Sequence, residues 1–423
     1  MSLIKKPVNG MKDILPKEMQ IRDYVTRVIK ETYAGFGFSP IETPCVEHIE
    51  NLCSKQGGEN EKLIFKILKR GEKLDLANAA GEEDLTDSGL RYDLTLPLSR
   101  YYANHANELP SPFKALQIGS VWRADRPQKG RFRQFVQCDI DILGDPTNLA
   151  EIELILATTT ALSNIGFRGF TVRINDRRML KAMADYAGFN EADYDKVFIT
   201  LDKMDKIGLD GVKAELTDEG FSPESVEKYC ALFDEKAGDT SVIRNLKETI
   251  GACLSDACAD NLITIMETAK QISEADFQIV FDPTLVRRMS YYTGTIFEIG
   301  MDEFGSSVAG GGRYDEMIGR FTGQKTPACG FSIGFERIIT ILLDQDFRIP
   351  HAGEKYAFLI EKGASKERVA EVTREAMQLR KEGKQVLVAQ MNKNKKFQKE
   401  QLQKEGYDLD HIRDFYNTEL KRD

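Results

Sequence analysis

The stretch from Phe113 to Gly144, FKALQIGSVWRADRPQKGRFRQFVQCDIDILG, carries the most informative pattern of this chain. It predicts two antiparallel strands, because Pro127 and Gly130 mark a turn in the basic segment between two alternating runs. Side chains reverse at every residue of a strand, so alternate residues of the second run share a face. The first face is mainly apolar and carries Phe132, Gln134, Val136, Cys138, Ile140 and Ile142. The second face carries Arg131, Arg133, Phe135, Gln137, Asp139 and Asp141.

The second face changes along the strand from cations, through an aromatic ring, to an amide and two carboxylates. A ligand suited to it is polyanionic at one end, flat in the middle and cationic at the other. ATP lying beside an amino acid has this form. The alternative interpretation is a half-buried antiparallel strand with a polar outer face and a solvated basic loop, which shows the same alternation.

Length and composition indicate a soluble protein. The 423 residues suffice for two or three domains, and the hydrophobic content of 41% and charged content of 30% are ordinary. No apolar run approaches the ~18 residues that a membrane helix needs, and the N-terminus lacks the apolar core of a signal peptide. The seven cysteines form no CxxC pair and suit a reducing compartment. We therefore expect a cytoplasmic protein without membrane contact.

Histidine content and net charge limit the chemistry. The four histidines lie at positions 48, 105, 351 and 411, away from the polar motifs. This placement argues against a histidine general base and against a zinc site. The formal net charge of −9 lowers the expectation of a nucleic-acid partner without removing it, because phosphate contacts depend on local basic patches.

Hydrophobic periodicity predicts the elements outside this strand pair. Helices are expected at 17–33 and 149–165, a strand at 170–176, and a helical stretch without readable motifs at about 190–276. After position 350 the pattern is strand, helix and strand, followed by a lysine-rich helix at 392–405. No further strand is evident after position 407.

Three further motifs carry polar residues or glycines near predicted junctions between secondary-structure elements. LRYDLTLPLSRYY (90–102) passes from strand to helix and places Asp93, Leu94 and Thr95 at the changeover, a position that also suits a helix cap. GSSVAGGGRYDEMIG (305–319) contains a glycine run that permits close approach of the backbone to a ligand. PACGFSIGFERIITILLD (327–344) predicts a strand and then a helix with Arg337 in its first turn, where a bound anion would offset the unfavourable helix dipole.

In this order the motifs resemble those of class II aminoacyl-tRNA synthetases, in the form used by the histidine enzymes. The strand pair at 113–144 resembles motif 2, and the segment 327–344 resembles motif 3 with its Gly-Phe-Glu-Arg ending. The segment LVRRMSYYTGTIFEI (285–299) resembles a signature peculiar to the histidine members, which Arg287, Tyr291, Tyr292, Thr293 and Gly294 match. Arg288 replaces the usual glycine, and Ser290 stands where many members have aspartate.

The resemblance covers nearly the whole chain and implies an α+β, multidomain fold. Its antiparallel-sheet catalytic core would come in two parts, at 1–190 and 277–350. A helical insertion domain would occupy 191–276, and a small, shortened α/β domain of the anticodon-binding type would occupy 355–423. Pro44 stands where motif 1, an element of the dimer interface, has its proline, so a homodimer is expected.

The resemblance also implies a set of site residues. Arg123 and Arg287 would be the catalytic residues and act at the α-phosphate of ATP. The contacts to ATP would come from Arg123, Asp125, Arg131, Phe135 and Arg337. Mg²⁺ would bridge the outer phosphates, without an assigned protein ligand. L-histidine would be bound by Asp93, Leu94, Thr95, Gln137, Asp141, Tyr291, Tyr292 and Tyr314.

The implied activity is activation of L-histidine by ATP to histidyl-adenylate, followed by transfer to the 3′ end of tRNA(His). Motifs rich in arginine and poor in histidine agree with it, because a carboxylate nucleophile is already ionised at neutral pH and needs no protein base. One alternative is the regulatory subunit of ATP phosphoribosyltransferase, a non-catalytic histidine-binding paralogue. That family typically loses the Arg-Tyr-Tyr signature and the motif 3 arginine, which this chain keeps. Another is a paralogue that aminoacylates something other than tRNA.

Overall fold

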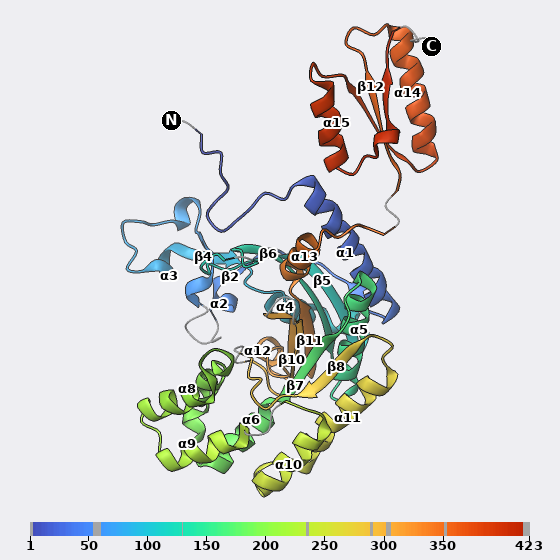
Figure 1. The fold of residues 1–423 in the computed structure, drawn as a ribbon. Coiled ribbons are helices and arrows are strands. Elements are labelled where there is room, and N and C mark those ends of the chain that lie inside the picture. The colour runs from blue at the N-terminus through green and yellow to red at the C-terminus, as the bar shows by residue number, and fades with distance from the viewer. Residues whose placement is uncertain are drawn as a thin grey trace. The chain divides into compact units, whose positions relative to one another are not determined.

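The computed structural model describes residues 3–53, 61–128, 130–233, 237–287, 291–301, 306–350 and 353–417. The chain divides into two compact units (Figure 1). The larger comprises residues 1–13 and 25–344, and the smaller comprises 14–24 and 345–423. Arg288 and Ser290, where the histidine signature departs from its usual form, lie outside the described residues.

The larger unit is built on an eight-stranded sheet in the order β1-β5-β6-β11-β10-β9-β7-β8. The strands from β5 to β7 in this order pair antiparallel, and a parallel strand is added at each edge. Their bounds are β1 (Ser39–Pro40), β5 (Phe113–Trp122), β6 (Gln134–Leu143), β7 (Phe170–Asp176), β8 (Phe277–Phe281), β9 (Thr295–Met301), β10 (Ser306–Arg313) and β11 (Ala328–Ile333). The antiparallel core and the α+β class are as predicted.

The β5–β6 pair runs in register from Phe113 opposite Leu143 to Trp122 opposite Gln134. The predicted start of the second strand at Arg131 is wrong, because β6 begins at Gln134. Arg131 instead belongs to a tight turn in which its backbone N–H donates to the Gln128 carbonyl at 2.9 Å. Gly130 permits this turn with a φ of +72°, a conformation that glycine adopts without steric cost.

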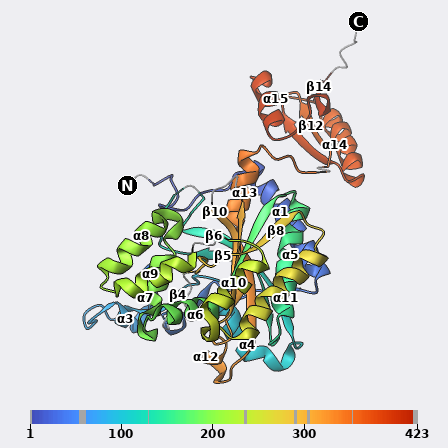
Figure 2. The ribbon, with the colours of Figure 1, turned by 60° about the horizontal axis from the view of Figure 1, so that its bottom comes forward.

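Helices pack along the large sheet at the positions that the periodicity predicts. Helix α5 (Leu149–Ile165) has the predicted bounds and contacts β11, and α11 (Asp256–Ile272) packs against α5, β7 and β8 (Figures 1 and 2). Helix α13 (Phe335–Asp344) follows β11 directly and contacts β6 and β10. Helix α1 (Pro16–Gly35) begins at the proline that favours a first helical turn.

The segment between β7 and β8 is helical, in agreement with its periodicity. It contains α6 (Arg177–Ala187), α7 (Tyr194–Leu201), α8 (Met204–Asp218), α9 (Pro223–Cys230), α10 (Thr240–Ile250) and α11. Helix α8 changes direction at Gly208, whose φ of +69° and ψ of 175° are not helical. Among the described helices, none combines the length and apolar character that crossing a membrane requires.

A small antiparallel sheet of order β2-β4-β3 precedes β5. Its strands are β2 (Val46–His48), β3 (Lys66–Leu68) and β4 (Thr86–Leu90), and the short helices α2 (Ile49–Leu52) and α3 (Glu82–Leu85) flank them. Strand β4 leads through Asp93 into α4 (Thr95–His105), as predicted. A separate core of Leu52, Ile64, Tyr92 and Leu96 supports this changeover. The four-residue helix α12 (Gly319–Thr322) contacts α4.

The smaller unit holds a parallel sheet of order β13-β12-β14. Strands β12 (Lys355–Ile360) and β13 (Gln385–Gln390) and helices α14 (Lys366–Lys381) and α15 (Lys395–Lys404) follow the predicted pattern. The expectation of no strand after position 407 is wrong, because β14 (Ile412–Phe415) pairs with β12. Two of its four residues are charged, so its sequence shows no alternation of apolar and polar residues. Its two apolar residues, Ile412 and Phe415, are nevertheless buried.

Candidate active site

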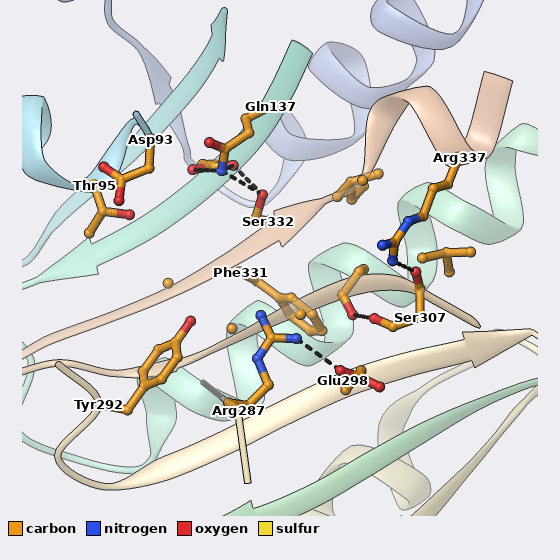
Figure 3. A pocket seen from close by; sticks show the side chains of 18 of the residues that line it. Asp93, Thr95, Gln137, Arg287, Tyr292, Glu298, Ser307, Phe331, Ser332 and Arg337 are labelled. Carbon is orange, nitrogen blue, oxygen red and sulfur yellow. Dashed lines mark hydrogen bonds and ion pairs between the residues drawn. The ribbon is translucent and has the colours of Figure 1, made fainter. Parts of the chain in front are cut away.

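A cleft of about 630 Å³ opens on the polar face of the large sheet (Figure 3). Directly paired positions of antiparallel strands face the same side, and one such row crosses the floor of the cleft. The row consists of Arg173 on β7, Glu298 on β9, Gly310 on β10, Ser332 on β11 and Asp139 on β6. The glycine in its middle leaves room above the sheet, between polar side chains on either side.

One end of the cleft holds buried hydrogen-bond acceptors. Asp93 and Asp141 are each only 3% exposed. The Tyr314 hydroxyl donates to Asp141 Oδ1 at 2.5 Å, and the backbone N–H of Leu96 donates to Asp93 Oδ1 at 3.0 Å. Within the described part of the chain, Asp93 Oδ2, Gln137 Oε1 and Asp141 Oδ2 have no hydrogen-bond partner. Because buried acceptors without donors are costly, this end suits a ligand that donates several N–H groups.

The orientation of the Gln137 amide follows from its neighbours. Its Nε2 donates to Asp139 Oδ2 at 3.2 Å and to Ser332 Oγ at 3.3 Å. The Ser332 hydroxyl in turn donates to Asp139 Oδ1 at 2.5 Å. With its amino group bound in this way, Gln137 presents its unpartnered carbonyl oxygen as an acceptor.

Burial disfavours the charged forms of these carboxyl groups. It raises the pKa of Asp139 to about 7, although the hydrogen bond from Ser332 opposes the shift. Burial also raises the pKa of Asp93, against a hydrogen bond from the Leu96 N–H, and that of Asp141, which the negative charge of Asp139 raises further. A cationic ligand would lower these pKa values, because a nearby opposite charge favours the carboxylate.

Three tyrosines line the same end of the cleft. The ring centroids of Tyr291 and Tyr292 are 4.8 Å apart, and Tyr291 meets Tyr314 edge to face at 6.0 Å. Tyr292 and Tyr314 are 8% and 2% exposed. Such rings offer apolar faces with hydroxyl groups at their edges, a surface suited to a small planar heterocycle.

The glycine run lies inside β10 and provides space for Arg287. A Cβ atom at Gly310 would overlap the Arg287 guanidinium, and one at Gly312 would meet Tyr292. Arg287 Nη1 donates to Glu298 Oε2 at 3.0 Å (Figure 3). The backbone of Arg287 has a φ of +58°, in the left-handed region that residues with a Cβ rarely enter.

A second arginine enters the cleft from α13. Arg337 lies in the first turn of this helix, and its Nη1 donates to the backbone carbonyl of Ser307 (Figure 3). Burial lowers the pKa of Arg337; the charge of Glu298 opposes this, and the positive charges of Arg131 and Arg287 lower it further. The three arginines are thus close enough to repel one another, and an anion between them would relieve the repulsion.

Arg123 lies directly after β5 among aromatic rings. Its Nε donates to the Tyr92 carbonyl at 3.0 Å, and its guanidinium carbon is 4.3 Å from the centroid of the Tyr92 ring. The same carbon is 5.1 Å from the centroid of Phe135. In the neighbouring turn, Arg131 Nη2 pairs with Asp125 Oδ1 at 2.9 Å, and the Arg131 side chain is 53% exposed. Arg131 therefore lies at the open side of the cleft.

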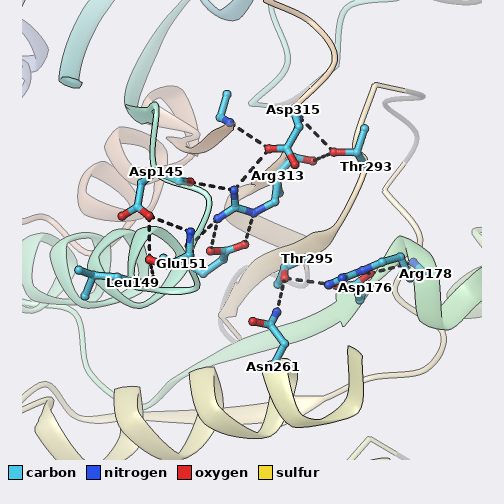
Figure 4. Close-up of polar contacts among 12 residues, drawn as sticks. Asp145, Leu149, Glu151, Asp176, Arg178, Asn261, Thr293, Thr295, Arg313 and Asp315 are labelled. Atoms are coloured by element: carbon cyan, nitrogen blue, oxygen red, sulfur yellow. Dashed lines mark hydrogen bonds and ion pairs between the residues drawn. The ribbon is translucent and has the colours of Figure 1, made fainter. Parts of the chain in front are cut away.

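Ion pairs outside the cleft hold the end of β10, which Tyr314 follows directly (Figure 4). The Arg313 guanidinium binds Glu151 of α5 in a bidentate manner, with Nε–Oε1 at 2.7 Å and Nη2–Oε2 at 2.6 Å. It also donates to the carbonyls of Asp145 at 3.1 Å and Thr147 at 2.8 Å. These bonds tie the end of β10 to the start of α5, which fixes the position of Tyr314 over the sheet.

The structure brings nearly all of the predicted site residues to one cleft. The lining includes Asp93, Thr95, Arg123, Asp125, Arg131, Phe135, Gln137, Asp141, Arg287, Tyr291, Tyr292, Tyr314 and Arg337. Leu94 is different: it is 1% exposed, and its carbonyl accepts a hydrogen bond from Gln117 at 3.1 Å. Leu94 turns into the core, while its neighbours Asp93 and Thr95 face the cleft.

Several lining residues were not predicted from the sequence. Glu298 lies in the predicted TIFEI strand, but nothing local distinguishes it from any other strand glutamate. Arg173, from the strand at 170–176, is likewise placed in the cleft only by the pairing of β7 with β9. Residues 201, 202 and 204–206, around the start of α8, also line the cleft, although their segment carried no readable motif.

The described residues contain no preformed cluster of metal-ligating side chains. No group of three or more histidine, cysteine, aspartate or glutamate side chains is arranged there to hold an ion.

Comparisons with known proteins agree on one family. A family model described as histidyl-tRNA synthetase matches residues 10–338. The histidine–tRNA ligase of Leifsonia xyli subsp. xyli is 46% identical over 344 residues, which cover 79% of this chain and 80% of that protein. The histidine–tRNA ligase of Christiangramia forsetii is 37% identical and covers 79% of this chain and 75% of its own length.

Solved structures of similar fold point the same way. Histidyl-tRNA synthetase from Nostoc sp. PCC 7120 has a TM-score of 0.78 at 27% identity, covering 96% of this chain and 90% of that one. A Bacillus halodurans C structure described as an ATP phosphoribosyltransferase regulatory subunit/histidyl-tRNA synthetase has a TM-score of 0.76 at 22% identity, which shows a shared fold alone. From the family match and the identity to its curated relatives, the chain belongs to the histidyl-tRNA synthetase family.

Proposed function

We propose that this protein is a class II aminoacyl-tRNA synthetase that activates L-histidine with ATP and transfers it to the 3′ end of tRNA(His). Membership of the histidyl-tRNA synthetase family supports the activity. The observation that carries the proposal is the division of one cleft into two ends. Unpartnered buried acceptors lie at one end, and closely spaced arginines lie at the other.

The acceptor end is the proposed histidine site. Gln137 Oε1 and Asp141 Oδ2 would accept hydrogen bonds from the α-ammonium group, which needs acceptors and carries the charge that ionises Asp141. The imidazole would lie among the tyrosine rings. Asp93 and Thr95 would complete this pocket, and Leu94 would support it from the core. The histidine-binding set is thus Asp93, Leu94, Thr95, Gln137, Asp141, Tyr291, Tyr292 and Tyr314.

The arginine end is the proposed nucleotide site. Arg123 would hold the α-phosphate and the attacking carboxylate, and Arg287 would approach that phosphate from the opposite side. Arg131 and Arg337 would bind the γ-phosphate of ATP. The exposed side chain of Arg131 lies at the open side of the cleft, where an entering nucleotide could contact it. Phe135 would stack on adenine, with Asp125 near its amino group. Mg²⁺ would bind together with ATP and would supply further positive charge at the phosphates, and no residue is assigned as its ligand.

The arrangement can promote adenylate formation by alignment and charge. A histidine carboxylate oxygen attacks the α-phosphorus, and the bond from that phosphorus to the bridging oxygen breaks as pyrophosphate leaves. Negative charge accumulates on phosphoryl oxygens during this step, and preorganised guanidinium groups stabilise it. No general base is required, because the attacking carboxylate is already ionised.

The second step and the assembly are part of the same proposal. In the core formed by 1–190 and 277–350, a ribose hydroxyl oxygen of the 3′-terminal adenosine of tRNA(His) would attack the carbonyl carbon of histidyl-adenylate. The new ester bond would form as the bond from that carbon to the phosphate oxygen breaks, AMP leaves and the hydroxyl proton passes to solvent. The segments 191–276 and 355–423 would serve as an insertion domain and a tRNA-contacting domain of the anticodon-binding type. We propose a homodimer, on the basis of Pro44 and the motif 1 resemblance.

ATP–pyrophosphate exchange with each of the twenty amino acids tests the first step. Exchange with histidine alone is the expected result, and charging of a tRNA(His) transcript then tests the second step. Histidine binding without exchange would reject the synthetase proposal and favour the regulatory paralogue. Exchange without charging of tRNA would indicate a different acceptor.

A further inference from the structure

Glu298 occupies a central position on the cleft side of β9. It lies directly opposite Arg173 of β7 and Gly310 of β10 in the two strand pairs. Its side chain is 21% exposed, so it is half-buried rather than solvated. Because Gly310 has no side chain, the space above β10 is left to the guanidinium of Arg287, which reaches Glu298 across it.

The carboxylate of Glu298 stands between two arginines. Its Oε2 accepts from Arg287 Nη1 at 3.0 Å, and its Oε1 lies 3.9 Å from Arg173 Nη1. Arg173 has further carboxylates, since its Nε donates to Asp282 Oδ2 at 2.5 Å and its Nη1 is 3.6 Å from Asp205 Oδ2. Arg173 is thereby fixed to the sheet and holds one oxygen of Glu298, so the other remains directed at Arg287.

The backbone next to Arg287 is held separately from its side chain. The buried Asn175 donates through Nδ2 to the Leu285 carbonyl at 3.0 Å and to the Pro283 carbonyl at 3.3 Å. These bonds hold the loop that precedes Arg287. They do not determine the position of the guanidinium, which lies at the end of a long side chain with several rotatable bonds. That position depends on Glu298, on the neighbouring Tyr292 and on the open space over Gly310.

We propose that Glu298 is a positioning residue for the catalytic arginine Arg287, and that Arg173 keeps Glu298 in place. This proposal rests on the function proposed above. A guanidinium has five N–H donors, so one bond to Glu298 leaves the others for phosphate oxygens. Glu298 also supplies negative charge among Arg173, Arg287 and Arg337, which allows these cations to lie close together before a nucleotide binds.

A positioning role differs measurably from a purely structural one. If Glu298 acts through Arg287, its loss should lower the rate of activation much more than the affinity for histidine, because Glu298 pairs with Arg287 and Arg173 and not with the buried acceptors proposed to bind the histidine ammonium group. Its loss should also have no further effect once Arg287 is absent, since two residues that act as a unit are not additive. A structural role predicts a lower melting temperature and equal losses in both backgrounds.

The test is a double-mutant cycle of Glu298→Gln and Arg287→Ala in full-length protein, read by histidine-dependent pyrophosphate exchange. Glu298→Gln alone should lower kcat on the order of 10- to 100-fold, as expected for a misplaced catalytic group, with KM for histidine within about threefold. In the Arg287→Ala background it should change kcat by less than about twofold. Glu298→Asp, which keeps the charge, should recover part of the rate.

A matched control is Glu153→Gln, since Glu153 is 27% exposed and pairs with Lys114 at 2.6 Å outside the cleft. It should stay within about twofold of the parent protein. A kcat of Glu298→Gln within threefold of the parent, or an equal loss in both backgrounds, would overturn the positioning role alone. Absence of histidine-dependent exchange in the parent would instead reject the proposed function. If Glu298→Gln does not fold, Glu298→Asp carries the same cycle, with a smaller expected loss.

Discussion

Arg287 combines an unfavourable backbone conformation with a central place in the cleft. A φ of +58° costs a non-glycine residue on the order of 1–2 kcal/mol, and such conformations persist where the surroundings impose them. Here the hydrogen bonds from Asn175 and the pairing with Glu298 impose it from two sides. The strain directs the side chain across β10, where its guanidinium lies over Gly310.

Replacement of Arg287 by alanine should therefore abolish most of the activation step. Loss of one preorganised charge-stabilising donor typically costs 10²–10³ in rate, so we expect pyrophosphate exchange to fall by ~100-fold or more. The control is Arg244→Ala, which removes an exposed arginine paired with Glu267 and should leave the rate unchanged. An Arg287→Ala protein within threefold of the parent would contradict the assigned role.

Asp139 gives the ligand-free protein a pH-dependent stability. Its folded-state pKa of about 7 lies above the ordinary value near 3.8. Between these two pH values Asp139 is mostly protonated in the folded protein and mostly ionised in the unfolded chain. The stability contribution is therefore greatest at the acid end of this window and decreases as the pH rises through 7. Asp93 and Asp141, whose pKa values burial also raises, act in the same direction.

Asp139→Asn should flatten this dependence. We expect the variant to lose less stability than the parent between pH 5 and pH 8, since each unit of pKa shift corresponds to ~1.4 kcal/mol. Urea unfolding of ligand-free protein across this range measures the effect. Asp218→Asn, at an exposed aspartate of α8, is the control and should follow the parent. Parallel pH profiles for parent and Asp139→Asn would refute the interpretation.

Among the elements, strand β10 is unusual because it contains three consecutive glycines, which have no side chains. These glycines lie between β9 and β11. At each of them, a Cβ atom would overlap atoms of another residue. A Cβ at Gly311 would meet the backbone carbonyl of Gly330, which cannot move easily. At Gly310 the obstructed group is the flexible end of Arg287. The two positions therefore serve different purposes, the first for packing and the second for the site.

Gly310→Ala should accordingly impair activity more than stability. The new methyl group would displace the Arg287 guanidinium, and we expect at least a tenfold loss of pyrophosphate exchange with a melting temperature close to the parent value. Gly300→Ala on the adjacent strand β9 is a matched control, because a Cβ there meets no described atom within 4 Å. Equal activity of the two variants would show that Arg287 does not need the space over Gly310.

At the scale of the whole molecule, the lysine-rich helix α15 is less uniform than its sequence suggests. Lys395 and Lys399 bind Asp414 of β14 at 2.8 and 3.0 Å, so they hold the helix to its own sheet. Lys393, Lys396 and Lys404 are exposed, and Phe397 beside them is 54% exposed. Exposed cations with an aromatic ring among them suit a nucleic-acid strand.

Replacement of the exposed lysines should affect the second step of the proposed reaction and leave the first step unchanged. Combined replacement of Lys393, Lys396 and Lys404 by alanine should raise KM for tRNA in the charging reaction and leave pyrophosphate exchange unchanged. The salt dependence of tRNA binding should become shallower, by about one unit of slope per lost phosphate contact. Lys395→Ala would instead be expected to destabilise the smaller unit. An unchanged salt slope in the triple variant would assign tRNA contact to another surface.

Local sequence patterns predict most of the elements and the chemical character of the cleft. Alternation placed Phe135, Gln137 and Asp141 on one face of β6, and the structure has them in one cleft. Helical periodicity located α5 to the residue and α13 closely. These features are predictable because strand and helix periods depend on near neighbours along the chain. Strand β14 was not predicted, because it is too short to show a period, and β6 starts later than predicted.

Contacts between residues far apart in the sequence depend on the tertiary fold. The glycine run lies within a central strand, β10. Glu298 meets Arg287 and Arg173 because the register of β7, β9 and β10 aligns them. Register depends on the packing of the whole sheet, and a shift by one residue would turn every side chain to the other face. Pairs formed in this way leave no local pattern, so the support for Arg287 could be recognised only in the folded protein.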